Sequence, residues 1–276
     1  MKNMSLASLS NPASQVLTIS RFEVLKHFRA KKVFGLLALA VGLAIFVIAF
    51  PELFDVDRPE SERAFIGSSL DALGFLLVIT AVLFGSNALS SEFHDRTGFA
   101  LFPNPVSKWT IWLGKFLGAE LTSFAIIGIY YGIIISATFS IYEIVPIEVY
   151  ISVVFSLFVT TMIMSFAFFL SSIINGPTSS AVFVFFLFIL ILPMTDAFLI
   201  NLAEVKPWYS PTFSDGIIAN ILTVPYPSDL EPGALPRGPF DHERFVPYIF
   251  QSIVVLSIYT ISFSLASAIL FKRKEM

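Results

Sequence analysis

The sequence predicts an all-α, polytopic membrane protein with six transmembrane helices. Of its 276 residues, 56% are hydrophobic and only 13% are charged, and the mean hydropathy is +0.81. A typical soluble domain carries about 25% charged residues, so this chain has more apolar side chains than a soluble core could bury. The apolar residues form long charge-free runs. Continuous runs favour helices, because a membrane strand would alternate apolar and polar side chains over about ten residues.

The charge-free runs predict where the helices lie, since one crossing needs about 20 mostly apolar residues. The run 149–195 is too long for one crossing, and Asn175-Gly176-Pro177 within it is typical of a turn, so we divide it there. The six-helix domain then covers 33–271, between a leader at 1–32 and a basic tail at 272–276. The predicted spans are 33–50, 72–91, 118–140, 149–171, 178–200 and 246–271.

The distribution of Lys and Arg predicts the orientation of these helices. With six spans, the leader, the loop after the second span and the tail lie on one side of the membrane. The positive-inside rule places that side in the cytoplasm. The sequence therefore predicts a multi-pass protein of the cell membrane, embedded in the lipid bilayer, with both termini cytoplasmic. These segments hold most of the 17 basic residues, namely Lys2, Arg21, Lys26, Arg29, Lys31, Lys32, Arg96, Lys108, Lys115, Lys272, Arg273 and Lys274.

Two segments outside the spans are predicted to contain helices. At 15–32, Leu17, Val24 and Phe28 recur at helical spacing among basic residues. Such an amphipathic helix lies in the membrane interface, and a simply solvated basic leader is the alternative. The outer loop 204–245 is proline-rich and mostly irregular, but 212–223 is predicted to be a short helix dipping toward the membrane surface. A simple packed loop is the alternative there.

The segment 90–116, between the second and third spans, is predicted to form two short helices projecting from the cytoplasmic face. Glu92 and Arg96 are spaced i, i+4 and can pair on the first helix, which Gly98 and Pro103 then interrupt.

Asn104-Pro105 is typical of the start of the second helix, with Asn as the N-cap and Pro at the first position. That helix carries Trp109 and Trp112, which favour the membrane interface, and it runs into the third span. The predicted membrane-interface anchors are Arg21, Lys26, Trp109, Trp112 and Lys115.

This segment resembles the coupling loop of ABC-2 type permease subunits of ABC transporters. Pro105-Val106-Ser107-Lys108 and then Gly114-Lys115 match the family's pattern of Pro-Val-Ser-Arg followed by Gly-Lys. Lys108 stands where Arg is usual, and Thr97-Gly98 reverses the family's Gly-Thr order. The six spans, the amphipathic N-terminal helix and the long outer loop extend the resemblance over nearly the whole chain.

The resemblance implies an exporter in which this chain and a second permease copy, identical or related, join ABC ATP-binding subunits. In the family the loop docks on the ATPase, which the resemblance implies for the coupling loop 91–113. The chain has no Walker A pattern, so ATP and Mg²⁺ are expected on the partner ATPase and no cofactor on this chain. The alternative is a plain basic loop obeying the positive-inside rule. The residues implied to couple to the ATPase are Glu92, Asp95, Arg96, Gly98, Pro105, Ser107 and Lys108.

Few residues qualify for other chemistry, and neither a catalytic residue nor a metal site is predicted. The chain has no cysteine, and its three histidines fall in segments separated by membrane. Ionisable residues near lipid are functional candidates by default, so Glu120 and Asp196 are candidates for the substrate pathway. Ordinary placement at the membrane edge is the alternative for both. Gly128 and Gly132, spaced four apart, are predicted to let helices approach closely.

The sequence thus predicts a permease subunit of an ATP-driven transporter that is not itself an enzyme. The alternatives are a membrane assembly or scaffold subunit that transports nothing and a membrane-embedded enzyme. An enzyme would need a convergent polar cluster within the spans, which the sequence does not offer. No nucleic-acid partner is predicted.

Overall fold

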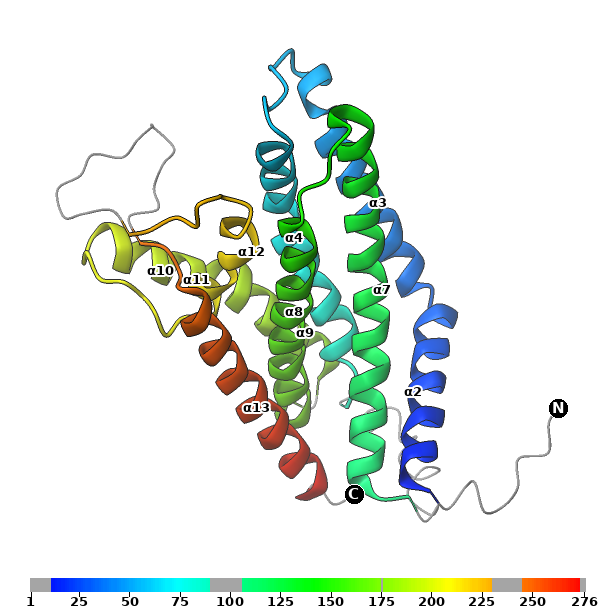
Figure 1. Cartoon of the computed structure of the whole chain (residues 1–276). Coiled ribbons are helices and arrows are strands. Elements are labelled where there is room, and N and C mark those ends of the chain that lie inside the picture. Colours follow the sequence, from blue (N-terminus) through cyan, green and yellow to red (C-terminus); the bar gives the residue numbers. More distant parts are fainter. Residues whose placement is uncertain (1–10, 90–105, 175, 230–244, 274–276) are drawn as a thin grey trace.

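The computed structural model describes residues 11–89, 106–174, 176–229 and 245–273, and within these ranges the regular elements are all helical (Figure 1). Within the described residues, six segments are long and apolar enough to cross a membrane. They are α3, α4, α7, α8, the composite α9–η1–α10, and α13, which confirms the all-α class and the number of spans. The elements are α2 (Pro12–Arg29), α3 (Lys32–Leu53), α4 (Glu62–Gly85), α7 (Lys108–Tyr142), α8 (Glu148–Ile173), α9 (Pro177–Phe186), η1 (Leu187–Ile191), α10 (Leu192–Asn201), α11 (Pro211–Asp215), α12 (Ile217–Asn220) and α13 (Ile249–Arg273).

Two helices start about ten residues before the predicted spans, because a charge-free run is not the same as a helix. α4 was predicted at 72–91 but begins at Glu62, where the Ser61 hydroxyl accepts a hydrogen bond from the Ala64 amide at 3.2 Å. α7 was predicted at 118–140 but begins at Lys108 and has 35 residues. At 1.5 Å per residue it is about 50 Å long, while the hydrocarbon core is about 30 Å thick, so α7 extends beyond the core.

α4 and α8 form the centre of the bundle. Their most apolar stretches are 56% and 61% buried, against 17% to 33% for the other four spans. Polar side chains fasten α7 to both. The Tyr130 hydroxyl donates to the Ser69 carbonyl on α4 at 2.5 Å, and the Tyr131 hydroxyl lies 2.8 and 2.7 Å from the hydroxyls of Ser152 and Ser156 on α8. Buried polar groups need such partners, so these contacts fix how the central helices face one another.

The fifth span is a single crossing built from α9, the π-helical turn η1 and α10. Pro193 is the second residue of α10, which begins directly after the wide turn. Its ring has no N–H to donate and would crowd the carbonyl four residues earlier in a regular helix. A π turn inserts an extra residue and relieves this conflict. The crossing therefore consists of two α-helical halves joined at a wide turn.

The predicted single helix at 212–223 is two short helices, α11 and α12, divided at Gly216. Ile217, Ile218 and Leu222 are buried, and the Ser152 hydroxyl of α8 donates to the Ile218 carbonyl at 2.8 Å. Residues 211–220 of the outer loop therefore fold against the bundle as two short helices.

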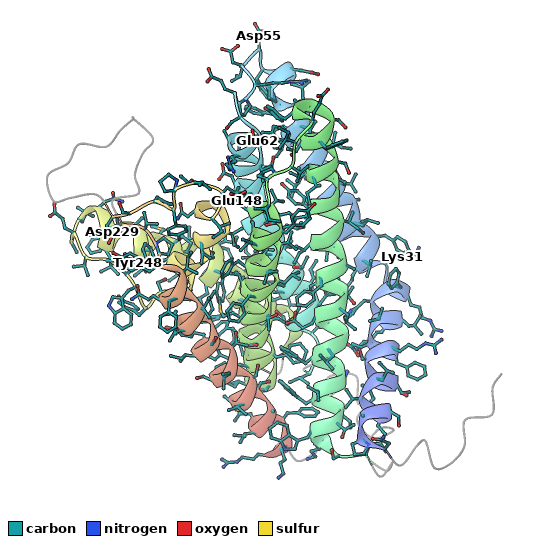
Figure 2. All side chains as sticks on the ribbon, viewed as in Figure 1. Lys31, Asp55, Glu62, Glu148, Asp229 and Tyr248 are labelled. Atoms are coloured by element: carbon teal, nitrogen blue, oxygen red, sulfur yellow. The ribbon has the colours of Figure 1, made fainter. Side chains whose placement is uncertain are left out.

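The two ends of the bundle carry opposite charge. We call the end with Lys108, Lys272 and Arg273 the basic end and the other end, which carries Asp55 and Glu62, the acidic end. In Figure 1, α2 and the last turn of α13 lie together at the basic end, as six crossings require. Figure 2 shows Asp55, Glu62 and Glu148 toward the opposite end. The side of the membrane that each end faces stays a prediction.

α2 is the predicted amphipathic helix, but its polar side faces the protein. It begins at Pro12 after the N-cap Asn11, and its side chains Ser20, Glu23 and His27 are buried. Several large apolar residues point away from the protein instead. Exposed large side chains on α2 are Leu17, Phe22, Leu25 and Phe28.

Two glycines of α7 allow α2 to pack closely. A Cβ atom added at Gly114 would lie 2.6 Å from Cβ of Ile19, and one added at Gly118 would lie 2.7 Å from Cβ of Glu23. The prediction that Gly128 and Gly132 provide close packing is wrong within this chain, because a Cβ at either would meet no atom within 4 Å. The spacing of four was the correct signal, but it operates about four turns nearer the start of α7.

A buried ion pair joins the same two helices. The ammonium of Lys115 lies 3.2 Å from Oε2 of Glu23, and their side chains are 4% and 6% exposed. Lys115 is therefore a packing residue rather than the predicted interface anchor. Removing one partner of such a pair typically costs about 3–5 kcal/mol, because the remaining charge stays buried.

His27 is held neutral beside this pair. Burial lowers its pKa to about 4, and the nearby charges of Lys26, Lys32 and Lys115 lower it further, while the charge of Glu23 opposes them. Its ring stacks at a tilt on Phe84 of α4, with centroids 4.6 Å apart. α2 thus contacts α4 as well as α7.

We expect Gly118→Ala to destabilise the protein by about 1–3 kcal/mol, because the new methyl group overlaps Glu23 and must push α2 away. The measurement is the thermal unfolding midpoint of the purified protein in lipid nanodiscs. Gly128→Ala is the control; it meets no neighbour, so its midpoint should stay unchanged or rise slightly with the better helix propensity of alanine. Equal midpoints for both variants would contradict the close packing of α2 on α7.

We expect the packing of α2 on the bundle to become less stable as the pH falls from 6.5 toward 4. The folded pKa of His27 lies below its ordinary value of 6.5, so the unfolded state binds the proton more tightly and acid favours it. The free energy of unfolding should fall by about 2 kcal/mol at pH 5. Thermal midpoints at pH 7.5 and 5 measure it, with His27→Gln as the comparison. A fall in midpoint of the same size in that variant would show that other groups cause the effect.

Candidate functional site

The start of α7 is capped and fastened at the basic end. Ser107, in extended conformation, accepts a hydrogen bond from the Thr110 amide at 3.1 Å. The helix therefore starts at Lys108, and the prediction that Asn104-Pro105 starts it is wrong. Ser107 provides the better-placed cap, three residues later. The ammonium of Lys108 donates to the Lys272 carbonyl at 3.1 Å, which ties this helix start to the end of α13.

Trp112 strengthens the same joint from inside the protein. Its indole N–H donates to the Ser267 hydroxyl of α13 at 3.0 Å, and its ring stacks on Phe116 with centroids 5.1 Å apart. Trp112 is buried, which corrects its predicted place at the membrane interface, whereas Trp109 is 42% exposed. A displacement of the start of α7 must therefore carry α13 with it through these contacts, and α2 through the glycine contacts.

The residues predicted to couple to an ATPase divide into two groups. Ser107 and Lys108 lie together at the basic end, next to the last turn of α13. The second group of predicted coupling residues lies outside the described residues and consists of Glu92, Asp95, Arg96, Gly98 and Pro105. Arg21 and Lys26 are not in this set; they were predicted as membrane-interface anchors. Both are exposed on α2, and that role stays a prediction.

α4 exposes a stripe of small and polar residues, which we call the α4 stripe. Asp71 lies near the middle of this span, on the exposed side, and has no hydrogen bond or ion pair with the described residues. A carboxylate facing lipid near the centre of a span costs about 2.5–3.5 kcal/mol on insertion scales. This face is therefore unsuited to lipid and suited to protein or water. The α4 stripe consists of Ala64, Gly67, Ser68, Asp71 and Gly74.

The sequence reasoning missed Asp71 because the predicted span 72–91 begins directly after it. The charge-free criterion placed this charge just outside the membrane. The Ser61 cap and the regular spacing of apolar residues after it were the signals that could have extended the helix back across Asp71.

A second polar site lies toward the acidic end, in a cavity of about 470 Å³ between α4, η1–α10, α11–α12 and residues 245–247. We call it the acidic pocket. Asp196 on its wall accepts hydrogen bonds from the hydroxyls of Ser210 at 2.7 Å and Thr212 at 2.5 Å. Asp215 also lines the cavity; burial, and next the charge of Asp196, raise its pKa to about 8.

Asn220 completes the polar part of the acidic pocket. Its side chain is buried, and its amide nitrogen has no hydrogen-bond partner in the described part of the chain. A buried donor without an acceptor is unfavourable, so its position on the cavity wall is informative.

An ion-pair cluster holds one wall of the acidic pocket. The Lys206 ammonium lies 2.9 Å from both carboxylate oxygens of Asp229 and 3.7 Å from the centroid of the Tyr248 ring. Partial burial alone would raise the pKa of Asp229, but the hydrogen bonds from the Val246 amide and Lys206 outweigh it and lower that pKa. Figure 2 shows Asp229 and Tyr248 close together. The cluster fixes the segment that contains the wall residue Pro247.

The two residues predicted to line a substrate pathway lie in different places. Asp196 faces the acidic pocket. Glu120 is buried between α7 and α8, where the Thr161 hydroxyl donates to Oε2 at 3.3 Å and Oε1 has no partner in the described residues. Within those residues, no three His, Asp or Glu side chains gather as a metal site would require.

The comparisons with known proteins agree with this architecture. The chain matches the family described as ABC-2 family transporter protein over residues 4–276. The comparison with curated proteins gave no match. The matched region includes all six helices that can cross a membrane and both ends of the bundle. The chain therefore belongs to the ABC-2 transporter family and is a membrane-spanning permease of that family.

Proposed function

We propose that this permease is the membrane half of an ATP-driven exporter whose ATPase is a separate chain that grips the basic end. The observation that carries the proposal is the joint at the start of α7. α7 is about 20 Å longer than the hydrocarbon core. Lys108 and Trp112 fasten its first turns to α13, and Gly114 and Gly118 hold α2 against it. A push on residues 90–116 would therefore reach several helices at once.

The basic end faces the cytoplasm in this proposal, because loops rich in Lys and Arg are retained on that side. ATP and Mg²⁺ bind the partner ATPase, since this chain contributes no phosphate-binding glycine-rich loop. The exposed apolar side of α2 would rest on the inner leaflet of the cell membrane, next to the docked ATPase.

The substrate pathway runs between two permease copies along the α4 stripe. Small residues let a second helix approach closely, and Asp71 needs a protein or water environment rather than lipid. Gly67 and Gly74 face open space within one chain, so a second copy can occupy that space. Closure of the ATPase pair would move α7 and α13 and so change the spacing of the two α4 stripes.

We expect Lys108→Glu to reduce ATP-dependent transport at least tenfold while leaving the thermal midpoint within about 2 °C of wild type. The substitution breaks the contact with the Lys272 carbonyl and reverses a charge on the proposed docking surface. The assay is uptake into inside-out vesicles by the permease with the ATPase that co-purifies with it. Lys272→Glu is the control, because its carbonyl is retained.

Two results would contradict the docking proposal. One is a permease that never co-purifies with an ATPase and drives no transport. In that case a scaffold role would become the better interpretation. The other is equal transport by Lys108→Glu and Lys272→Glu, which would show that the contact between α7 and α13 does not transmit the movement of the ATPase to the membrane helices.

We expect Ser68→Cys to cross-link to itself between two copies, because Ser68 lies on the α4 stripe. The chain has no native cysteine, so each variant carries one thiol. A short bifunctional maleimide added to native membranes, followed by denaturing electrophoresis, measures the dimer. Ile258→Cys is the control, since Ile258 is 58% exposed on α13 and lies outside the stripe. Dimers from Ile258→Cys but not from Ser68→Cys would place the interface on another face.

A further inference from the structure

We propose that the acidic pocket binds an organic cation with an apolar body and an oxygen acceptor, and that compounds of this class are the cargo. The cargo assignment rests on the proposed function, whereas the binding itself can be tested on the permease alone.

The charge of the pocket is uncompensated. Asp196 and Asp215 both line the cavity, and the described lining residues include no Lys, Arg or His. Lys206, on the nearby loop, is held by Asp229 and is not a wall residue. Asp196 is held in place by Ser210 and Thr212, while Asp215 has no hydrogen bond to a described residue. A cation entering the pocket would therefore meet one oriented carboxylate and one that is free to pair.

Asn220 is an independent sign of a ligand. Asn220 lines the same cavity and is 8% exposed, and its amide nitrogen has no acceptor among the described residues. A buried N–H without a partner is unfavourable, and a carbonyl or hydroxyl oxygen of a ligand would satisfy it. The two carboxylates lie on α10 and α11 and the amide on α12, so the ligand would carry its charge and its oxygen at separate positions.

The remaining walls suit an apolar body. Val78, Phe188, Ile189, Phe213 and Phe245 contribute to the lining, and the volume of about 470 Å³ falls in the usual range for small-molecule sites. Aromatic rings add attraction for a cation placed over their faces. A small hydrated metal ion would leave these walls unused, which favours an organic cation.

The pocket also connects to the proposed pathway. Gly74 belongs to the α4 stripe and lines the acidic pocket as well. A cation that leaves the neighbourhood of Asp71 would therefore reach the pocket along one helix. The π turn and Pro193 form the facing wall.

Binding should strengthen as the pH rises from 7 to 9. Asp215 carries a proton over part of this range, because burial and the charge of Asp196 raise its pKa to about 8. A bound cation favours the ionised carboxylate, so loss of the proton and entry of the cation assist each other. Among the described lining residues, only Asp196 and Asp215 titrate in the walls; α4 and residues 245–247 contribute no charged group.

Ethidium, a permanently charged aromatic cation, is the probe, and its fluorescence is titrated with the full chain in nanodiscs of neutral lipid. We expect wild-type protein to bind it and tetraphenylphosphonium to displace it. Asp215→Asn should weaken binding at least tenfold and abolish its pH dependence. Asn220→Ala should leave the affinity for ethidium within about twofold of wild type, because ethidium has no oxygen acceptor. The same variant should weaken the binding of an amine that carries a carbonyl at least fivefold. Procainamide, read by displacement of ethidium, is that amine.

Glu143→Gln is the matched control, since Glu143 is an exposed carboxylate away from the cavity. Thermal midpoints are measured for every variant, and Asp196→Asn serves as a second charge variant should Asp215→Asn fail to fold. Equal ethidium affinity in wild type and the charge variants would overturn the proposal, as would equal binding of the neutral dye diphenylhexatriene to the pocket. The titration needs no ATPase or nucleotide. Failure of ATPase docking would therefore refute the proposed function alone, and failure of binding would refute this inference alone.

Discussion

The attachment of α2 and α13 to the first turns of α7 is the constraint on which the rest of this structure depends. α7 is longer than the hydrocarbon core is thick, so part of it lies outside the apolar region, and it packs on both α4 and α8. Two different interactions hold α2 against α7. Glycines remove the steric barrier to α2, and a buried Glu23–Lys115 pair makes separation costly. An α-helix this well supported transmits displacement along its axis instead of bending.

The sequence reasoning succeeded where hydropathy alone decides the outcome and failed where side-chain contacts decide it. The number of spans follows from the charge-free runs, and the helix at 15–32 follows from the spacing of its apolar residues; the number is confirmed, and the helix is observed at Pro12–Arg29. The side of α2 that faces the protein could not be predicted. Its polar residues Glu23 and His27 face inward, and several large apolar residues face outward, because the partner surface on α7 offers Lys115 and two glycines. Nothing in the local pattern of α2 carries that information.

The candidate site shows the same division. Asp196 was identified from its position near a membrane edge, and the structure places it on a cavity wall. Asp215 and Asn220 were not identified, because the short helix predicted at 212–223 was judged only by its apolar residues, and both polar side chains meet Asp196 only through the fold. Asp71 was lost for a simpler reason, since a rule that ends each span at the nearest charge cannot find a charge inside a span. Charges within membrane helices are the ones with most functional weight, so that rule fails at the most informative positions.

The wide turn in the fifth span has a mechanical consequence. Regular α-helix resists bending because every carbonyl is bonded to an amide one turn later, and that ladder is interrupted where η1 meets Pro193. α9 and α10 are therefore two helical segments that can tilt relative to each other at this turn. Tilting α10 relative to α9 would widen or narrow the cavity beside Asp196, so one wall of the acidic pocket contains its own hinge.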